Sequence, residues 1–185
     1  VGTQVTQYFQ SMGTAFTGVL MPGIVKMVES GVDSKTLTDE MIRIGRIILI
    51  VLGLIWGGFL ACGQQFITLW AGADNSNAYF VAIILMTAYM FILTESIGTQ
   101  ILWAMNQHKE QAILKGIIVL LNILLTVVLI KWQPLIGATI GTFISLVLGD
   151  VVVMNVIFRK KLKMNLGYYY KGLTKGILPC IAVAT

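Results

Sequence analysis

The stretch IILIVLGLIWGGFLACGQQFITLW, residues 47–70, is an almost uninterrupted run of apolar side chains. A helix that crosses the hydrocarbon core of a bilayer needs about 20 such residues. The whole chain shares this character: 57% of its 185 residues are hydrophobic and 11% are charged, whereas soluble domains carry about 25% charged residues. So few charges cannot cover a water-soluble surface of this size. The sequence therefore predicts an all-α integral membrane protein, a polytopic helix bundle.

Other apolar segments predict further transmembrane helices. A short surface helix, with Thr36 and Asp39 forming a capping box, is expected to lead into residues 47–70. The remaining full spans are expected at about residues 3–22, 78–105, 112–130 and 135–158.

Three regions follow from this assignment. Residues 1–158 are expected to hold about five full transmembrane helices. Residues 159–175 are expected to form a basic, amphipathic connector along the membrane surface. Residues 176–185 are apolar but cover only about half of the ~20 residues that a crossing needs, so we expect the start of a further, truncated span.

Lysine and arginine gather in alternate connections between the spans. Of the 13 basic residues, 12 lie before residue 47, around residues 109–115 and after residue 158, and Lys131 alone lies on the other side. By the positive-inside rule the crowded side is cytoplasmic, so residues 3–22 run from outside to inside. Because no aromatic residues interleave with these charges on one soluble face, the net charge of +5 indicates membrane orientation and not nucleic-acid binding.

Polar side chains recur every three or four residues along one side of the first span. This polar stripe consists of Thr3, Gln7, Gln10, Thr14 and Thr17. Unsatisfied amides facing hydrocarbon cost several kcal/mol each, so the stripe is expected to face protein or water. One interpretation is a water-filled cavity in which the stripe contacts cargo, and the other is hydrogen-bonded contact between helices. The opposite side, which carries Phe16 and Val19, is expected to face lipid or packed helices.

Glu95 and Asp150 are the acidic residues that lie well inside apolar spans. A charge at mid-bilayer costs at least about 2.5–3.5 kcal/mol, which makes both residues candidates for coupling transport to an ion. The alternative is that each acid is protonated, or is paired with a Lys or Asn for structural reasons.

The last full span carries a small residue at every fourth position. This small-residue seam consists of Gly137, Gly141, Ser145 and Gly149. Such a seam lets two helix backbones approach closely, so it predicts helix packing.

Several kinds of active site are missing from the sequence. It has no GxxxxGK[ST] loop for a nucleotide, no His, Cys and Asp cluster at metal-ligand spacing, and no Ser or Cys with a His partner in a span. Cys62 and Cys180 lie in apolar runs, where buried packing thiols are expected. The sequence therefore predicts a protein that is not an enzyme and that uses no cofactor or metal.

Three motifs resemble those of a known family. They are VLMPGIVKM at residues 19–27, FITLWAG at residues 66–72, and the hairpin LNILLTVVLIKWQPLIGATIGTFIS at residues 121–145. They resemble motifs of the polysaccharide flippases, which move O-antigen and capsular repeat units. This family belongs to the multidrug/oligosaccharidyl-lipid/polysaccharide exporter superfamily. The hairpin is the most specific part of the resemblance.

The resemblance implies a fold of two six-helix lobes that face each other across a cavity. The chain then corresponds to the C-terminal half, with its full helices matching roughly spans 8 to 12. The implied function is to flip undecaprenyl-pyrophosphate-linked oligosaccharides from the inner to the outer leaflet, by alternating access driven by a proton or ion gradient. The implied location is the bacterial cytoplasmic membrane, where the chain is multi-pass.

The resemblance also implies partners: the lipid-linked oligosaccharide, the bilayer, an N-terminal lobe of the same chain, and a polysaccharide polymerase and glycosyltransferase complex. One departure concerns the pyrophosphate, because these spans hold no Arg or Lys well inside the bilayer; Lys26 and Lys115 lie near its inner boundary. Two alternatives stay open: an ion-coupled multidrug or organic-cation antiporter of the same superfamily, and a non-transporting membrane assembly subunit.

Overall fold

The computed structural model describes residues 1–106, 109–131 and 134–174. In this part of the chain every regular element is a helix. The elements are α1 (Gly2–Glu29), α2 (Ser34–Ala71), the 3-10 turn η1 (Ala73–Asn75), α3 (Ala78–Thr94), α4 (Ser96–Ala104), α5 (Lys109–Ile130), α6 (Pro134–Leu146), the π-helical segment η2 (Val147–Val153) and α7 (Met154–Lys161). A last helix, called here helix 166–174, follows α7.

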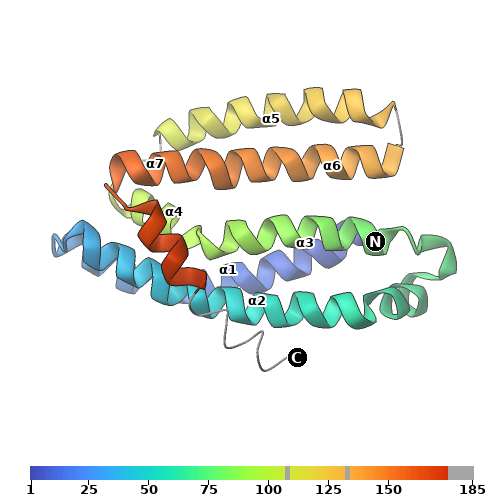
Figure 1. Cartoon of the computed structure of the whole chain (residues 1–185), viewed down its shortest axis with the longest axis horizontal. Coiled ribbons are helices and arrows are strands. Elements are labelled where there is room, and N and C mark those ends of the chain that lie inside the picture. The colour runs from blue at the N-terminus through green and yellow to red at the C-terminus, as the bar shows by residue number, and fades with distance from the viewer. Residues whose placement is uncertain (107–108, 132–133, 175–185) are drawn as a thin grey trace.

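The long helices lie side by side along one axis, with α3 at the centre (Figure 1). Helix α3 contacts α1 and α2 on one side and α6 on the other. Helix α5 packs on α6 at the edge of the bundle, and helix 166–174 crosses the bundle near α4 and the start of α2 (Figure 1).

The buried core lies where α2, α3, α4, α7 and helix 166–174 meet. Its most enclosed large side chains include Met41, Ile48 and Leu52 of α2, Met86 of α3, Ile97 and Leu102 of α4, Phe158 of α7 and Tyr169. Helix α5, in contrast, exposes Ile113, Ile117, Leu120 and Leu124 along its outer side. Soluble monomers rarely expose a contiguous apolar surface of this kind, and lipid is a suitable environment for it.

Among the described residues, four helices are long and apolar enough to cross a membrane. They are Gly2–Glu29, Ser34–Ala71, Gln111–Ile130 and Ile136–Lys161. Helices α3 and α4 together make a fifth candidate span, but they are bent by 42°. The prediction of an all-helical bundle is therefore confirmed for the described residues, and their apolar helices are compatible with a multi-pass membrane protein. The expected truncated span at residues 176–185 lies outside them.

Two helix predictions need correction. The span expected at residues 78–105 is broken at Glu95, where α3 ends and α4 begins. At this break the Ser96 hydroxyl donates a hydrogen bond to the Leu93 carbonyl at 2.5 Å, and side chains that bond into the backbone in this way are a known cause of sharp helix bends. The surface helix expected before residue 47 is not a separate element, because α2 runs without a break over 38 residues.

The cap of α2 also differs from the prediction. Asp33, not the Thr36–Asp39 pair, caps this helix: its carboxylate accepts hydrogen bonds from the Thr36 amide, at 3.2 Å, and from the Thr36 hydroxyl. The hydrogen bonds from Thr36 lower the pKa of Asp33, so the cap stays ionised at neutral pH. Asp39 instead accepts a hydrogen bond from the Tyr168 hydroxyl, at 2.9 Å.

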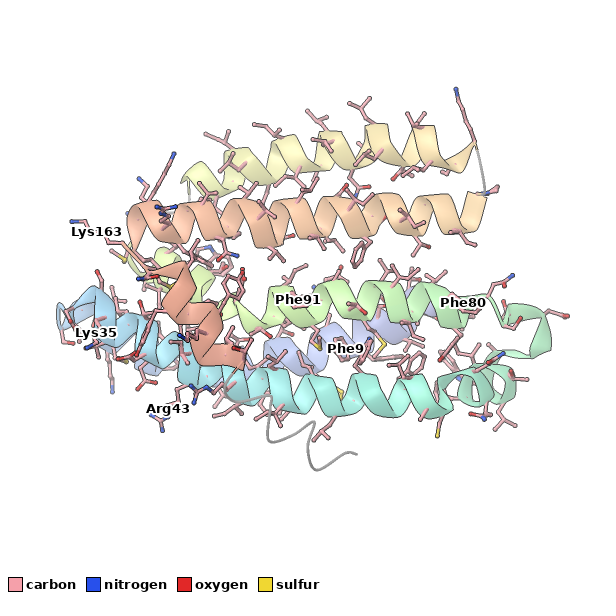
Figure 2. The ribbon with its side chains drawn as sticks, viewed as in Figure 1. Phe9, Lys35, Arg43, Phe80, Phe91 and Lys163 are labelled. Carbon is pink, nitrogen blue, oxygen red and sulfur yellow. The ribbon has the colours of Figure 1, made fainter. Side chains whose placement is uncertain are left out.

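Basic side chains gather at one end of the bundle, called here the basic end. Lys35, Arg43 and Lys163 lie there, although they come from α2 and from the segment after α7 (Figure 2). The alternation of helix directions in Figure 1 brings these connections to one end, as the charge pattern predicts.

The small-residue seam lies against α5. A Cβ atom built on Gly137 would overlap the Leu129 carbonyl oxygen, and one built on Gly149 lies 2.6 Å from the Ile118 side chain. A Cβ on Gly141 lies 3.1 Å from the Thr126 hydroxyl, and Ser145 is buried and donates a hydrogen bond to the Gly141 carbonyl. The seam thus lets the backbones of α5 and α6 approach closely.

Replacing Gly137→Ala is expected to destabilise the protein by about 1–3 kcal/mol, because the added methyl group meets backbone atoms that have no room to move. Gly57→Ala is the matched control, since a Cβ there meets nothing within 4 Å and alanine favours a helix by up to about 1 kcal/mol. Thermal unfolding of the purified protein in detergent measures both. Equal unfolding temperatures for the two variants would contradict the close approach of α5 and α6.

Candidate functional site

The polar stripe lies mostly on the open surface of α1. Thr3, Gln7 and Thr14 are exposed, Gln10 is half-buried, and Thr17 is buried. The packed face of α1 lies beside the stripe and consists of Gly2, Thr6, Phe9, Gly13 and Thr17, followed by Ile24. Of the side expected to face lipid or packed helices, Met12, Phe16 and Val19 are exposed.

Two glycines bring α1 close to the rest of the bundle, and of the polar stripe only Thr17 belongs to the packed face. A Cβ on Gly2 lies 2.7 Å from the Ala78 carbonyl oxygen of α3, and a Cβ on Gly13 lies 2.6 Å from the Leu93 side chain. The hydroxyls of Thr14 and Thr17 donate to carbonyls of α1 itself, those of Ser11 and Gly13. Within the described residues, no hydrogen bond joins the polar stripe to another helix.

Glu95 lies at the break between α3 and α4 and is 4% exposed. Its Oε1 atom accepts hydrogen bonds from the Tyr170 hydroxyl at 2.5 Å and from Asn155 Nδ2 at 2.9 Å. Asn155 also donates to the Val151 carbonyl and to the Tyr170 hydroxyl, at 2.8 and 2.6 Å. This polar cluster of Glu95, Asn155 and Tyr170 joins the helix break to the end of η2, to α7 and to helix 166–174.

Two oxygens of the polar cluster are buried without a hydrogen-bond donor in the described part of the chain: Glu95 Oε2 and Asn155 Oδ1. A buried acceptor without a donor is costly, and more so for a carboxylate. A proton bound at Glu95 removes the charge and supplies one donor. The cluster can therefore hold an exchangeable proton.

Asp150 lies in η2 and is paired with Lys115 of α5. Its Oδ1 atom lies 2.9 Å from Lys115 Nζ, and the two side chains are 21% and 50% exposed. A π-helical segment inside an α-helix is frequent at functional sites. The two acids do not contact each other. Asp150 is paired with a lysine and Glu95 with an asparagine, as expected if the acids have structural roles.

Sequence reasoning missed Asn155 and Tyr170, which lie 60 and 75 residues from Glu95 along the chain. Asn155 gave a weak signal as an amide within an apolar span, and Tyr170 closes the run YYY in the connector. The packing expectation for Cys62 is wrong, because its side chain is exposed on α2; Cys180 lies outside the described residues. The described residues contain no group of three His, Cys, Asp or Glu side chains that could hold a metal ion.

Comparisons with protein-family models, with curated proteins and with solved structures found no match to this chain.

Replacing Tyr170→Phe is expected to lower the free energy of unfolding by about 1–3 kcal/mol, because a buried carboxylate loses its hydroxyl donor. Tyr168→Phe is the matched control: it removes a hydrogen bond to Asp39 at an exposed site, where a change within about 0.5 kcal/mol is expected. Chemical unfolding of the purified protein compares the two. If both variants unfold like the unchanged protein, the polar cluster does not stabilise the fold.

Proposed function

We propose that this chain belongs to a membrane transporter that flips lipid-linked oligosaccharides from the inner to the outer leaflet. In this proposal it contributes the second lobe, roughly spans 8 to 12, of an alternating-access transporter in the bacterial cytoplasmic membrane. The sequence motifs and the charge alternation support it. The polar stripe, which stays on an open face of α1, is the single observation that carries it.

The two glutamines of the polar stripe are the residues that most need a polar environment beside α1. The hydroxyls of Thr14 and Thr17 are satisfied within α1, but the side-chain amides of Gln7 and Gln10 make no hydrogen bond to the described residues. In hydrocarbon each such amide costs several kcal/mol. The stripe therefore needs water, cargo or another polar surface beside it, and in this proposal the cavity of a transporter supplies the water and the cargo.

The position of the polar stripe suits an oligosaccharide. From Thr3 to Thr14 it extends about 17 Å along the helix axis, at about 1.5 Å per residue, which is more than half of a hydrocarbon core of about 30 Å. Amides and hydroxyls both donate and accept hydrogen bonds, as sugar hydroxyls do. We propose that the stripe contacts the glycan as the lipid-linked cargo crosses, facing an N-terminal lobe across the cavity.

The acids support this function better than the export of organic cations. Lys115 neutralises Asp150, and two donors already bond one oxygen of Glu95, so the described residues offer a cation no open carboxylate pair. We assign Glu95 the coupling role, since it is the buried carboxylate with an oxygen left to bind a proton. In the same proposal Asp150 positions α5 against η2.

Single cysteines at Gln7 and Thr14 are expected to react with a membrane-impermeant thiol reagent, after Cys62 and Cys180 are replaced by serine in the full-length protein. Cysteines at Met12 and Val19 are the matched controls, because they are exposed on the apolar side of the same helix. Labelling in right-side-out and inverted vesicles measures access from each face. A cavity is ruled out if Gln7 and Thr14 label no faster than Met12 and Val19.

Glu95→Gln is expected to abolish export of lipid-linked oligosaccharide while the protein still inserts into the membrane, because the amide keeps the shape but binds no exchangeable proton. Asp150→Asn is expected to reduce export only in part. It weakens the ion pair with Lys115, in which the lysine side chain is 50% exposed and the aspartate side chain 21%. An export assay in cells, with protein levels matched, measures both. Normal export by the Glu95→Gln variant removes this residue from the coupling mechanism.

A further inference from the structure

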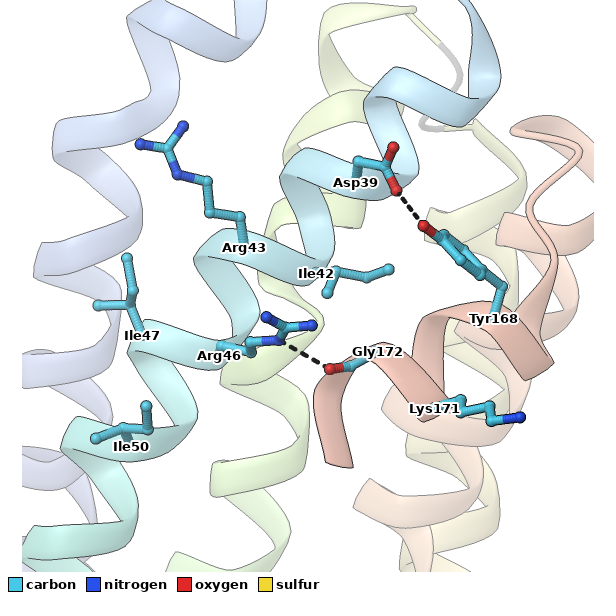
Figure 3. Close-up of a pocket in the computed structure, with 9 residues that line it drawn as sticks. All are labelled: Asp39, Ile42, Arg43, Arg46, Ile47, Ile50, Tyr168, Lys171 and Gly172. Atoms are coloured by element: carbon cyan, nitrogen blue, oxygen red, sulfur yellow. Dashed lines mark hydrogen bonds between the residues drawn. The ribbon is translucent and has the colours of Figure 1, made fainter. Parts of the chain in front are cut away.

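A groove of about 600 Å³ opens at the basic end, between α2 and helix 166–174. Figure 3 shows its lining: Asp39, Ile42, Arg43, Arg46, Ile47 and Ile50 of α2, with Tyr168, Lys171 and Gly172 of the second helix. Three of these residues are cationic and one is acidic. No residue of α1, the helix that carries the polar stripe, lines the groove.

Arg46 lies at the centre of the groove and is held in place by the backbone. Its Nε atom donates a hydrogen bond to the Gly172 carbonyl at 2.8 Å (Figure 3). This leaves the two terminal nitrogens of the guanidinium without a protein acceptor in the described residues. A side chain at position 172 would force Ile42 to move, since a Cβ there lies 2.8 Å from the Ile42 side chain. The glycine therefore allows the approach that fixes Arg46.

Two further cations line the groove. Arg43 comes from the preceding turn of α2 and Lys171 from helix 166–174, and their side chains extend away from Arg46 in opposite directions (Figure 3). Arg43 is largely exposed and makes an ion pair of 3.3 Å with Glu40, an exposed pair of the kind that contributes little. Asp39, the acid of the groove, is engaged by the Tyr168 hydroxyl. The groove thus offers an anion one oriented guanidinium, that of Arg46, and two further cations, Arg43 and Lys171, on side chains that are free of the backbone contact that fixes Arg46.

An apolar strip begins directly beside these cations. Ile47 and Ile50 also line the groove, and Leu54 continues the same face of α2, 70% exposed. The apolar run of residues 47–70 is about 36 Å long as a helix, so Arg46 falls at the edge of a hydrocarbon core of about 30 Å. Charge and apolar surface therefore meet at the depth where a lipid phosphate joins its acyl chains.

We infer that this groove binds the headgroup of an anionic phospholipid of the cytoplasmic leaflet, with the phosphate at the terminal nitrogens of Arg46, Arg43 and Lys171 as the further cations of the groove, and an acyl chain along Ile47, Ile50 and Leu54. Basic pockets on the cytoplasmic side of membrane proteins bind such headgroups. The bound lipid fastens helix 166–174 to α2. This site goes beyond the proposed transport function and does not depend on it, because the groove excludes the helix that carries the polar stripe.

The test is a titration of the full-length, detergent-purified protein with phosphatidylglycerol and, separately, with phosphatidylcholine, followed by native mass spectrometry. Phosphatidylglycerol is expected to bind more tightly than phosphatidylcholine. A double variant that combines Arg43→Gln and Lys171→Gln leaves the Arg46–Gly172 hydrogen bond intact. It is expected to weaken phosphatidylglycerol binding on the order of 25-fold, because each cation near the membrane surface contributes about fivefold.

Two single variants make the test specific. Lys26→Gln removes a charge at the same end of the bundle but outside the groove, and is expected to leave binding unchanged. Asp39→Asn keeps an acceptor for Tyr168 and removes the opposing charge, so binding is expected to tighten about fivefold.

Equal binding of the two phospholipids overturns the assignment, as does an equal loss in the Lys26→Gln variant. A third titration, with undecaprenyl pyrophosphate, separates a membrane lipid from the cargo: tighter binding of that lipid, lost in the double variant, overturns the assignment to a phospholipid. Weaker binding of the polyprenyl lipid than of phosphatidylglycerol supports it.

Discussion

A polar group inside a bilayer must find a hydrogen-bond partner within the protein or in enclosed water. This constraint accounts for the main irregular features of the bundle. Glu95 is its clearest case. The carboxylate lies where α3 gives way to α4, and Asn155 and Tyr170 bond it from α7 and from helix 166–174. One buried acid thus holds together the helix break, the last span and the connector.

The same constraint separates two kinds of polar residue on α1. Hydroxyls can donate to the carbonyl one turn earlier, as those of Thr6, Ser11 and Thr17 do. They are therefore tolerated on any side of the helix, whether it faces lipid or protein. Glutamine amides have no such local solution in a regular helix. For this reason Gln7 and Gln10, and not the more numerous threonines, require water or a polar partner beside α1.

Local sequence signals predicted the bundle well. The apolar runs and the alternating basic connections indicated membrane spans and the basic end without any tertiary information. The break at Glu95 was missed because residues 78–105 read as one apolar run, and its stabilising contacts come from 60 to 75 residues away. The Arg46 groove was missed for a similar reason: the α2 cations and Gly172 are distant in sequence and meet only when helix 166–174 docks.

The central claim is that the polar stripe of α1 contacts the glycan of a lipid-linked cargo. The most direct measurement is flipping of a fluorescent lipid-linked oligosaccharide by the full-length protein in reconstituted vesicles, with Gln7→Leu and Thr14→Val combined. Because both side chains are exposed, the variant is expected to fold and insert normally. The account predicts that it loses flipping while Met12→Leu, on the apolar side of α1, retains it. Undiminished flipping by the Gln7→Leu and Thr14→Val variant would contradict the account.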